Sequence, residues 1–422
     1  MKLPDKSSVA DPLPVSVLKQ VADDIAPFLM ELFNRSLAAG HFPSAFKEAF
    51  VTPVIKKPGL NAAEVSSYRL ISNLMVISKL LERLVAKQLT DYLRCANLLP
   101  PLQSGFRPGH STETATLRVL SDILEAVDSG DVAAPVLLDL SAAFDTVDHA
   151  ILCRRRLQVS YGLGDPVLEW FQSYLHAVHG RSQYVRRGTC KSFKTWPTCG
   201  VPQGSVLGPI LFLLYTSDLI GLVEQHGFRP HLYADDTQVY GSCRPSAVAD
   251  FQVRLSACVD NIAAWMLANR LQLNTGKTDL LWCATARRRH QLPTSALRIG
   301  SDFVSSSTSI RNLGIYFDAD LSTRCHFQKT VASCFAILRQ LRSIRRSVPT
   351  PVYQTLIVAL VLSQLDYGKA VLVGLPGYLY SWLQSVLNAA ARSIAGLRRS
   401  DHITDTLASF HWLNVHSTWM IS

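Results

Sequence analysis

The feature that most constrains this chain is a pair of adjacent carboxylates, Asp235 and Asp236, in the sequence HLYADDTQVY. β-favouring residues flank the pair, which predicts two strands joined by a tight turn that carries both carboxylates. Two carboxylates this close resist being ionised together unless a cation lies between them. A hard divalent cation such as Mg²⁺ prefers oxygen ligands and would allow both carboxylates to be ionised. Asp also favours turns for backbone reasons, so the pair alone leaves an ordinary turn as an equal alternative.

A third carboxylate, Asp139, follows an apolar run in the sequence PVLLDLSAAFDTVDH. Val136–Leu138 predict a buried strand, and a carboxylate at the end of such a strand is costly to bury without a partner. A metal ion would compensate it, whereas a helix N-cap is the ordinary alternative. Asp145, a little further on, is interpreted as structural. Carboxylates from separate strand ends can hold two metal ions for in-line phosphoryl transfer.

Basic and amide side chains complete the pattern that such a transfer requires. Lys56, Lys57 and Arg69 surround the turn Pro58-Gly59 and could hold a triphosphate, or they could form a solvated basic hairpin. Lys277, within LQLNTGKTDLLW, could donate a proton to a leaving group or be an ordinary turn lysine. Gln203 lies in the glycine- and proline-rich turn GVPQGSVLGP, where its amide offers both a donor and an acceptor.

Apolar residues at helical spacing predict several helices, and Ser111-Thr112 can cap one more helix that follows them. A serine-rich stretch, Ser301–Ser309, is predicted to be a hinge. Ile310–Leu321 predicts a pair of strands. The helical segments are 18–37, 76–93, 210–215, 248–273, 352–365 and 382–397.

The 422 residues are 48% hydrophobic and carry a net charge of +10, so the chain can form two or three cores and suits a polyanionic partner. The stretch from Leu321 to Leu365 contains no acidic residue. Its basic residues are Arg324, Lys329, Arg339, Arg342, Arg345 and Arg346.

The nine cysteines form no C-x-x-C pair, which favours a reducing compartment and argues against structural zinc. The first residues contain no apolar signal segment. Ala370–Ala391 is uncharged, but glycine, proline and amide residues interrupt it, so no membrane span is expected. The chain is expected to be soluble and intracellular; Arg287–Arg289 is too short to indicate nuclear import, which leaves nucleus and cytoplasm open.

In order and spacing, the chain resembles the reverse transcriptase of non-LTR (LINE-type) retrotransposons, in the group whose full elements carry an apurinic-type endonuclease. The resemblance runs from about Leu13 to about Val415. The segments that carry it are YRLISNL, QSGFRPGHST, LLDLSAAFDTVDH, GVPQGSVLGPILFLLYTSDL, HLYADDTQVY, LQLNTGKTDLLW, RNLGIYFDADLS, LRQLRSIRRSVP, LDYGKAVLVGLP and LNAAARSIAGLRRSDHIT.

This resemblance implies an α+β right-hand polymerase fold. Residues 1–134 would form N-terminal helices and fingers. Residues 135–300 would form the palm with its antiparallel sheet and catalytic site, with fingers elements interleaved. Residues 301–422 would form the primer grip and a helical thumb with a truncated C-terminus. The implied activity is RNA-directed DNA synthesis from an RNA template, a DNA primer and dNTPs, with two Mg²⁺ ions that Mn²⁺ could replace.

The resemblance also assigns roles to individual residues. Asp139, Asp235 and Asp236 would hold the metal ions, and Lys277 would be the acid for pyrophosphate departure. Phe144 would stack under the sugar and reject a 2′-hydroxyl. The remaining roles are triphosphate binding by Arg69 with Lys57 and Lys56, shaping of the nucleotide pocket by Gln203 and Gly204, and the primer grip at Leu313 and Gly314.

The sequence departs from the family pattern at a few places. In the segment YRLISNL, Leu70 replaces the proline that usually follows the arginine in this family, which loosens the backbone there. No segment resembles the endonuclease, and the end HSTWMIS diverges after Val415, so a truncated genomic copy is expected. The alternatives are a catalytically inactive nucleic-acid-binding remnant and an RNA-templated RNA polymerase or telomerase-like enzyme. Phe144 argues against ribonucleotide use.

Overall fold

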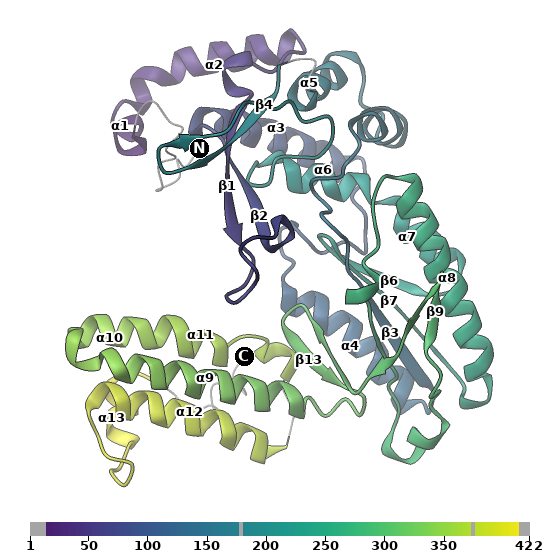
Figure 1. Cartoon of the computed structure of the whole chain (residues 1–422), viewed down its shortest axis with the longest axis vertical. Helices are drawn as coiled ribbons and strands as arrows, with labels where there is room; N and C mark the ends of the chain where they lie inside the picture. Colours follow the sequence, from purple (N-terminus) through teal and green to yellow (C-terminus); the bar gives the residue numbers. More distant parts are fainter. Residues whose placement is uncertain (1–13, 177–179, 373–375, 413–422) are drawn as a thin grey trace.

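The computed structural model describes residues 14–176, 180–372 and 376–412. The described chain is arranged as a letter C in Figure 1: helices and a sheet at the top, a second sheet with helices on the right, and a helical bundle at the lower left. The diverging tail HSTWMIS and the residues before Pro14 lie outside the described residues.

The secondary structure alternates between helices and short strands along the whole described chain. The helices are α1 (Val15–Gln20), α2 (Ala22–Ala38), α3 (Val76–Cys95), α4 (Thr112–Asp128), α5 (Asp165–Leu175), α6 (Leu207–Tyr215), α7 (Asp218–Gln225), α8 (Val248–Ala268), α9 (Arg324–Ile344), α10 (Thr350–Ile357), α11 (Ser363–Leu365), α12 (Gly377–Ala395) and α13 (Thr404–Ser409), with π-helical turns at Ile151–Ser160 and Val358–Leu362. The strands are β1 (Glu48–Ile55), β2 (Tyr68–Asn73), β3 (Val132–Leu138), β4 (Ser182–Arg187), β5 (Cys190–Lys191), β6 (Arg229–Tyr233), β7 (Asp236–Cys243), β8 (Asp279–Leu281), β9 (Leu297–Ile299), β10 (Asp302–Val304), β11 (Ser306–Ser307), β12 (Ser309–Asn312) and β13 (Ile315–Asp318).

The sheet on the right of Figure 1 has the strand order β11-β8-β3-β7-β6, and β3 lies at its centre. Side chains alternate between the faces of a strand. Val132, Val136 and Leu138 therefore join the large core that contains α8, whereas Ala133 packs on the other face with residues of α4. Both faces of β3 are covered, which explains why it reads as a nearly continuous apolar run.

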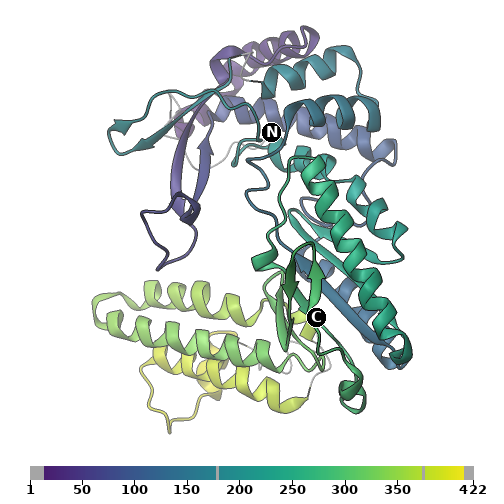
Figure 2. The same ribbon diagram turned by 45° about the vertical axis from the view of Figure 1, so that its right-hand side comes forward.

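The upper sheet has the order β2-β1-β4-β5, with β1 antiparallel to β2 and parallel to β4. The hairpin formed by β1 and β2 extends from the upper part toward the thumb helices in both views (Figures 1 and 2). Its far end carries the loop with Lys56 and Lys57, and Arg69 pairs with Val54 near that end. The hairpin thus holds basic residues away from the core of the upper part.

Buried apolar residues form one large core and smaller separate ones. The large core runs from Phe33 to Ile299, so the upper part and the central sheet pack as one body. The bundle of α9 to α12 has its own core, which includes Phe327, Tyr353 and Leu383. A third core joins α4 and β3 to the β12–β13 hairpin. The bundle is therefore attached to the central sheet through that hairpin and its neighbours.

Several expected elements are confirmed. α3 and α8 begin where the apolar pattern predicted, and Ser111 caps α4 by accepting a hydrogen bond from the Thr114 amide at 3.1 Å. The expected hinge at Ser301–Ser309 is wrong, because β10 and β11 form there and β11 pairs with β8. A serine-rich edge strand is polar on its solvent side, which made it look like a loop.

One stretch in the described part, Leu207–Gln225, is long and apolar enough to cross a membrane by length and composition alone. It comprises α6 and α7, and 61% of it is buried within the protein. Core helices of this kind have the same composition as membrane spans. The upper sheet with its helices, the central sheet and the helical bundle have the α+β arrangement of fingers, palm and thumb that the resemblance implies.

Glu82 of α3 tests how the fingers hold α6 in place. Its fully buried carboxylate accepts hydrogen bonds from the amides of Val206 at 2.7 Å and Leu207 at 3.2 Å, at the start of α6. We expect Glu82→Ala to lower the free energy of unfolding by at least about 1–3 kcal/mol, because buried donors lose their partner. Urea unfolding measures this. Glu125→Ala, on an exposed face of α4, is the control and should change it by no more than about 0.5 kcal/mol.

Candidate active site

The two adjacent carboxylates lie at the tip of the hairpin between β6 and β7, as the sequence predicted. Tyr233 pairs with Asp236, so Ala234 and Asp235 form a two-residue turn. Ala234 has a φ of +57°, in the left-handed region that costs a residue with a side chain roughly 1–2 kcal/mol. A tight turn of this kind places Asp235 and the first residue of β7 side by side.

Asp139 is brought to the same place by strand pairing. β3 runs antiparallel to β7, and Leu138 pairs with Thr237. Asp139 directly follows Leu138, and it is close enough to Asp236 to raise the pKa of that carboxyl group. The strand pairing therefore gathers Asp139, Asp235 and Asp236 at one end of the palm sheet.

The charges of these carboxylates affect one another. The pKa of Asp236 is raised to about 6, first because the surrounding protein removes hydration and then because Asp235 and Asp139 repel a further negative charge. Burial also raises the pKa of Asp235, and Asp139 adds to the rise, whereas Arg69 opposes it. The site is therefore short of positive charge at its centre.

Lys277 supplies one positive charge directly. Its Nζ lies 3.1 Å from Oδ2 of Asp139. Lys277 is well exposed, and an ion pair of this kind contributes only about 0–1 kcal/mol. The backbone holds the two segments together, because the Asn274 amide donates to the Asp139 carbonyl at 2.9 Å. The lysine is therefore positioned at the carboxylates while its side chain can exchange partners.

The donor set fits a hard divalent cation. Carboxylate oxygens are the preferred protein ligands of Mg²⁺, and a cation would relieve the repulsion that raises the pKa of Asp236. Within residues 14–176, 180–372 and 376–412, no His, Cys, Asp and Glu side chains form a closed group of three or more ready to hold a metal. Mg²⁺ keeps several waters and binds through few protein ligands, so a closed protein cage is not required.

The basic hairpin reaches the site through some of its residues. Arg69 is exposed and close enough to Asp235 to lower the pKa of that carboxyl group. Lys56 is near Asp145, and its Nζ donates to the Ser66 carbonyl at 2.9 Å. The side chain of Lys57 is exposed, and no contact in the described part of the chain links it to the carboxylates.

Hydrogen bonds link the segment that carries Phe144 to the segment that carries Gln203. The Phe144 ring is half-buried and stacks on Phe212, with the ring centroids 4.8 Å apart. The amide of Val201 donates to the Phe144 carbonyl at 2.8 Å, which ties the glycine-rich turn to this segment. Nε2 of Gln203 then donates to Oδ2 of Asp145 at 3.0 Å. Asp145 was expected only to support the fold, but it orients Gln203.

Gly204 allows the glycine-rich turn to approach the fingers sheet. Its φ is +106°, and a Cβ atom there would lie 2.8 Å from the Ser72 carbonyl oxygen. The preceding carbonyl of Gln203 accepts a hydrogen bond from the Ser72 amide at 2.7 Å. The turn is therefore fixed against β2, the strand that carries Arg69.

Leu313 and Gly314 form the turn between β12 and β13, with φ values of +44° and +92°. Tyr367, from the loop after α11, covers this turn: its hydroxyl donates to the Leu313 carbonyl at 2.5 Å and lies 3.2 Å from Oγ1 of Thr112. No local sequence pattern predicts this contact of Tyr367, because it joins segments far apart in the chain.

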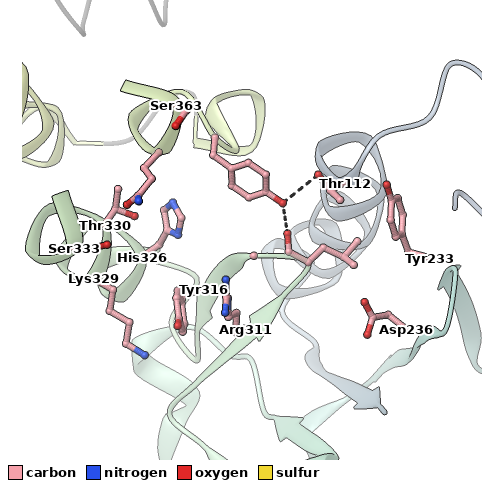
Figure 3. A pocket seen from close by; sticks show the side chains of 14 residues that line it. Thr112, Tyr233, Asp236, Arg311, Tyr316, His326, Lys329, Thr330, Ser333 and Ser363 are labelled. Carbon is pink, nitrogen blue, oxygen red and sulfur yellow. Dashed lines mark hydrogen bonds between the residues drawn. The ribbon is translucent and has the colours of Figure 1, made fainter. Parts of the chain in front are cut away.

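A cavity of about 780 Å³ opens between this turn, the palm and the thumb. Asp236 and Tyr233 lie on one side of it in Figure 3, and His326 and Lys329 of α9 lie on the other. Nζ of Lys329 lies 3.8 Å from the centre of the Tyr316 ring. The acid-free stretch thus places a basic thumb helix opposite the carboxylates. Its exposed basic residues are Arg324, Lys329, Arg339, Arg342 and Arg346.

Sequence comparison identifies the family. A model described as "Reverse transcriptase (RNA-dependent DNA polymerase)" matches residues 55–317. The probable RNA-directed DNA polymerase from transposon BS of Drosophila melanogaster is 33% identical over 322 residues, which cover 75% of this chain and 34% of that protein. The RNA-directed DNA polymerase from mobile element jockey of Drosophila funebris is 30% identical over 329 residues, covering 76% and 34%. The chain spans about a third of the length of these relatives.

A solved structure with a similar arrangement is apo telomerase from Candida tropicalis, with a TM-score of 0.47 and 12% identity over 94% of this chain and 74% of that one. The family model covers the carboxylates, the basic hairpin, the glycine-rich turn and the β12–β13 hairpin. The chain therefore belongs to the reverse transcriptase (RNA-dependent DNA polymerase) family.

Proposed function

We propose that this chain extends a DNA primer on an RNA template by nucleotidyl transfer from dNTPs. The observation that carries the proposal is the meeting of Asp139, Asp235 and Asp236 at one end of the palm sheet, beside the cavity that faces the thumb. Family membership supports the same reaction. The basic thumb helix suits the phosphate backbone of a primer–template duplex.

The three carboxylates would hold divalent cations, Mg²⁺ or Mn²⁺, at the end of β3 and the β6–β7 turn. When bound, such ions supply Lewis-acid activation of a primer 3′-hydroxyl and offset charge on the leaving pyrophosphate. Lys277 would release Asp139 and hold a proton at Nζ for the departing pyrophosphate. Its weak ion pair in the present structure is compatible with such an exchange.

The remaining side chains would bind and orient the nucleotide and primer. Arg69, with Lys56 and Lys57 from the same hairpin, would bind the triphosphate. Phe144, backed by Phe212, would lie under the sugar and exclude a 2′-hydroxyl. Gln203, oriented by Asp145, and the turn at Gly204 would shape the nucleotide pocket. Leu313 and Gly314, under Tyr367, would contact the primer terminus.

Primer extension on an RNA template with Mg²⁺ and dNTPs tests the proposal. We expect extension by the wild-type chain and none by Asp235→Asn/Asp236→Asn, because the carboxylates that hold the cations are lost. The matched control is Asp23→Asn/Asp24→Asn, which changes another adjacent pair, exposed in the first turn of α2, and should keep full activity. A folded wild-type chain that binds an RNA–DNA duplex without extending it would favour the inactive remnant instead.

Phe144 allows a test of sugar selection. Because Val removes the ring but keeps an apolar side chain, we expect Phe144→Val to raise incorporation of rNTPs relative to dNTPs by about 10- to 200-fold. The ratio of kcat/KM for a matched rNTP and dNTP measures this. Phe144→Tyr keeps the ring and should keep the wild-type ratio. An unchanged ratio in Phe144→Val would show that another group excludes the 2′-hydroxyl.

The charge repulsion predicts an unusual pH dependence of stability. The pKa of Asp236 is about 6 in the folded chain and near its ordinary value of 3.8 when unfolded, so the folded state binds more protons between these values and loses stability as pH rises through them. We expect Asp236→Asn to be more stable than wild type above about pH 6 without divalent cations, and equal to it below about pH 4.

Thermal unfolding at several pH values measures this difference. Adding Mg²⁺ at pH 8 should raise the melting temperature of the wild type more than that of Asp236→Asn, because a cation replaces the repulsion with attraction. A difference between the two proteins that stays constant from pH 4 to pH 8 would contradict the charge arrangement.

A further inference from the structure

The loop before α4 adds to the edge of the palm sheet next to the carboxylates. The Leu232 amide donates to the Leu102 carbonyl at 2.8 Å, and the Ser104 amide donates to the Leu232 carbonyl at 2.8 Å. Residues 102–104 therefore form an isolated parallel bridge to β6, centred on Gln103 and Leu232. Gln103, at the centre of this pairing, is only 1% exposed.

The buried amide of Gln103 holds both peptide groups that flank the α-carbon of Ala234. Its Oε1 accepts hydrogen bonds from the Gly105 amide at 2.8 Å and from the Ala234 amide at 3.0 Å. Its Nε2 donates to the Ala234 carbonyl at 3.3 Å. That carbonyl belongs to the peptide bond leading into Asp235, so one side chain fixes the backbone on both sides of Ala234.

The turn needs such support because of its conformation. Ala234 has a φ of +57°, which glycine adopts easily and alanine does not. Gly105 makes the close approach possible, because a Cβ atom there would lie 2.3 Å from the Ala234 nitrogen. The glycine, Gly105, is on the supporting loop, whereas the turn itself carries Ala234. The conformation of the turn therefore depends on contacts from the loop.

The supporting loop is itself held in place. Arg107 donates from Nη1 to the carbonyls of Pro100 at 2.8 Å and Gln103 at 3.2 Å. Oγ of Ser104 lies 3.1 Å from Nε2 of the buried His231 in β6. These contacts anchor the loop to the sheet but do not involve Ala234. The residues that anchor the loop are therefore different from Gln103, which contacts the turn.

We propose that Gln103 is a positioning residue for Asp235 and Asp236. By hydrogen-bonding the backbone of Ala234 at the sheet edge, Gln103 sets the geometry of the two carboxylates for cation binding. Gln103 acts through the backbone and touches neither substrate nor cation. The inference rests on the proposed function, because it assumes that these carboxylates bind divalent cations. Residues that orient metal ligands typically contribute about 10- to 100-fold to metal affinity or activity.

The test is a Mn²⁺ titration of the full chain with primer–template, in which electron paramagnetic resonance of the free ion reports how much Mn²⁺ is bound. Gln103→Met keeps the length of the side chain and removes every hydrogen bond to Ala234. Gln103→Glu keeps the acceptor atoms but loses the donor to the Ala234 carbonyl, and it serves if the methionine variant does not fold. Ser104→Ala is the matched control from the same buried loop.

We expect Mn²⁺ affinity to fall by about 10- to 100-fold in the Gln103 variant and by less than about twofold in Ser104→Ala, with primer–template affinity unchanged. A folded Gln103 variant with wild-type Mn²⁺ affinity would overturn the inference alone. An equal loss in Ser104→Ala would also overturn it, because the loop as a whole would then be responsible. Wild-type protein that binds no more Mn²⁺ than Asp235→Asn/Asp236→Asn would overturn the proposed cation site as well.

Discussion

The antiparallel pairing of β3 with β7 is the interaction on which the rest of the molecule depends. It places Asp139, at the end of one strand, beside Asp235 and Asp236, at the start of the other. Hydrophobic packing on both faces of β3 stabilises this pairing, although it brings like charges together. The folded chain thus stores electrostatic repulsion at one end of the sheet, and the core on both sides of β3 makes that arrangement tolerable.

Positive and polar groups from the loop after α8, the fingers and the thumb lie around these carboxylates. Lys277 comes from the loop after α8, and Arg69 from the fingers hairpin. The thumb presents Lys329 across the cavity, and Tyr367 ties the thumb to the β12–β13 turn and to the start of α4. The fingers, palm and thumb therefore meet around the same few carboxylates, which is the arrangement that the proposed function requires.

Local sequence patterns were sufficient for much of this picture. The hairpin with Asp235 and Asp236 follows from β-favouring runs around a turn, and α3 and α8 follow from apolar periodicity. The strands β10 and β11 were missed because they are short and lie within a serine-rich stretch, and β11, an edge strand of two serines, has no apolar face. The domain boundaries and the roles of individual site residues remain predictions.

Contacts between distant segments could not be predicted from local patterns. Gln103 and Ala234 are 131 residues apart, and neither residue type signals the other. The same holds for Tyr367 with Leu313, and for Arg156, which lies in an arginine-rich run but is buried with a hydrogen bond to Asn269 at 3.0 Å.

The central claim is that the three carboxylates form one cation-binding site. The most direct measurement is a crystal structure of the chain with Mn²⁺, in which anomalous scattering locates the ion. We expect a peak about 2 Å from oxygens of Asp139 and of Asp235 or Asp236, with the Lys277 side chain moved off Asp139. A structure in which Lys277 stays on Asp139 and no ion lies between the carboxylates would contradict it.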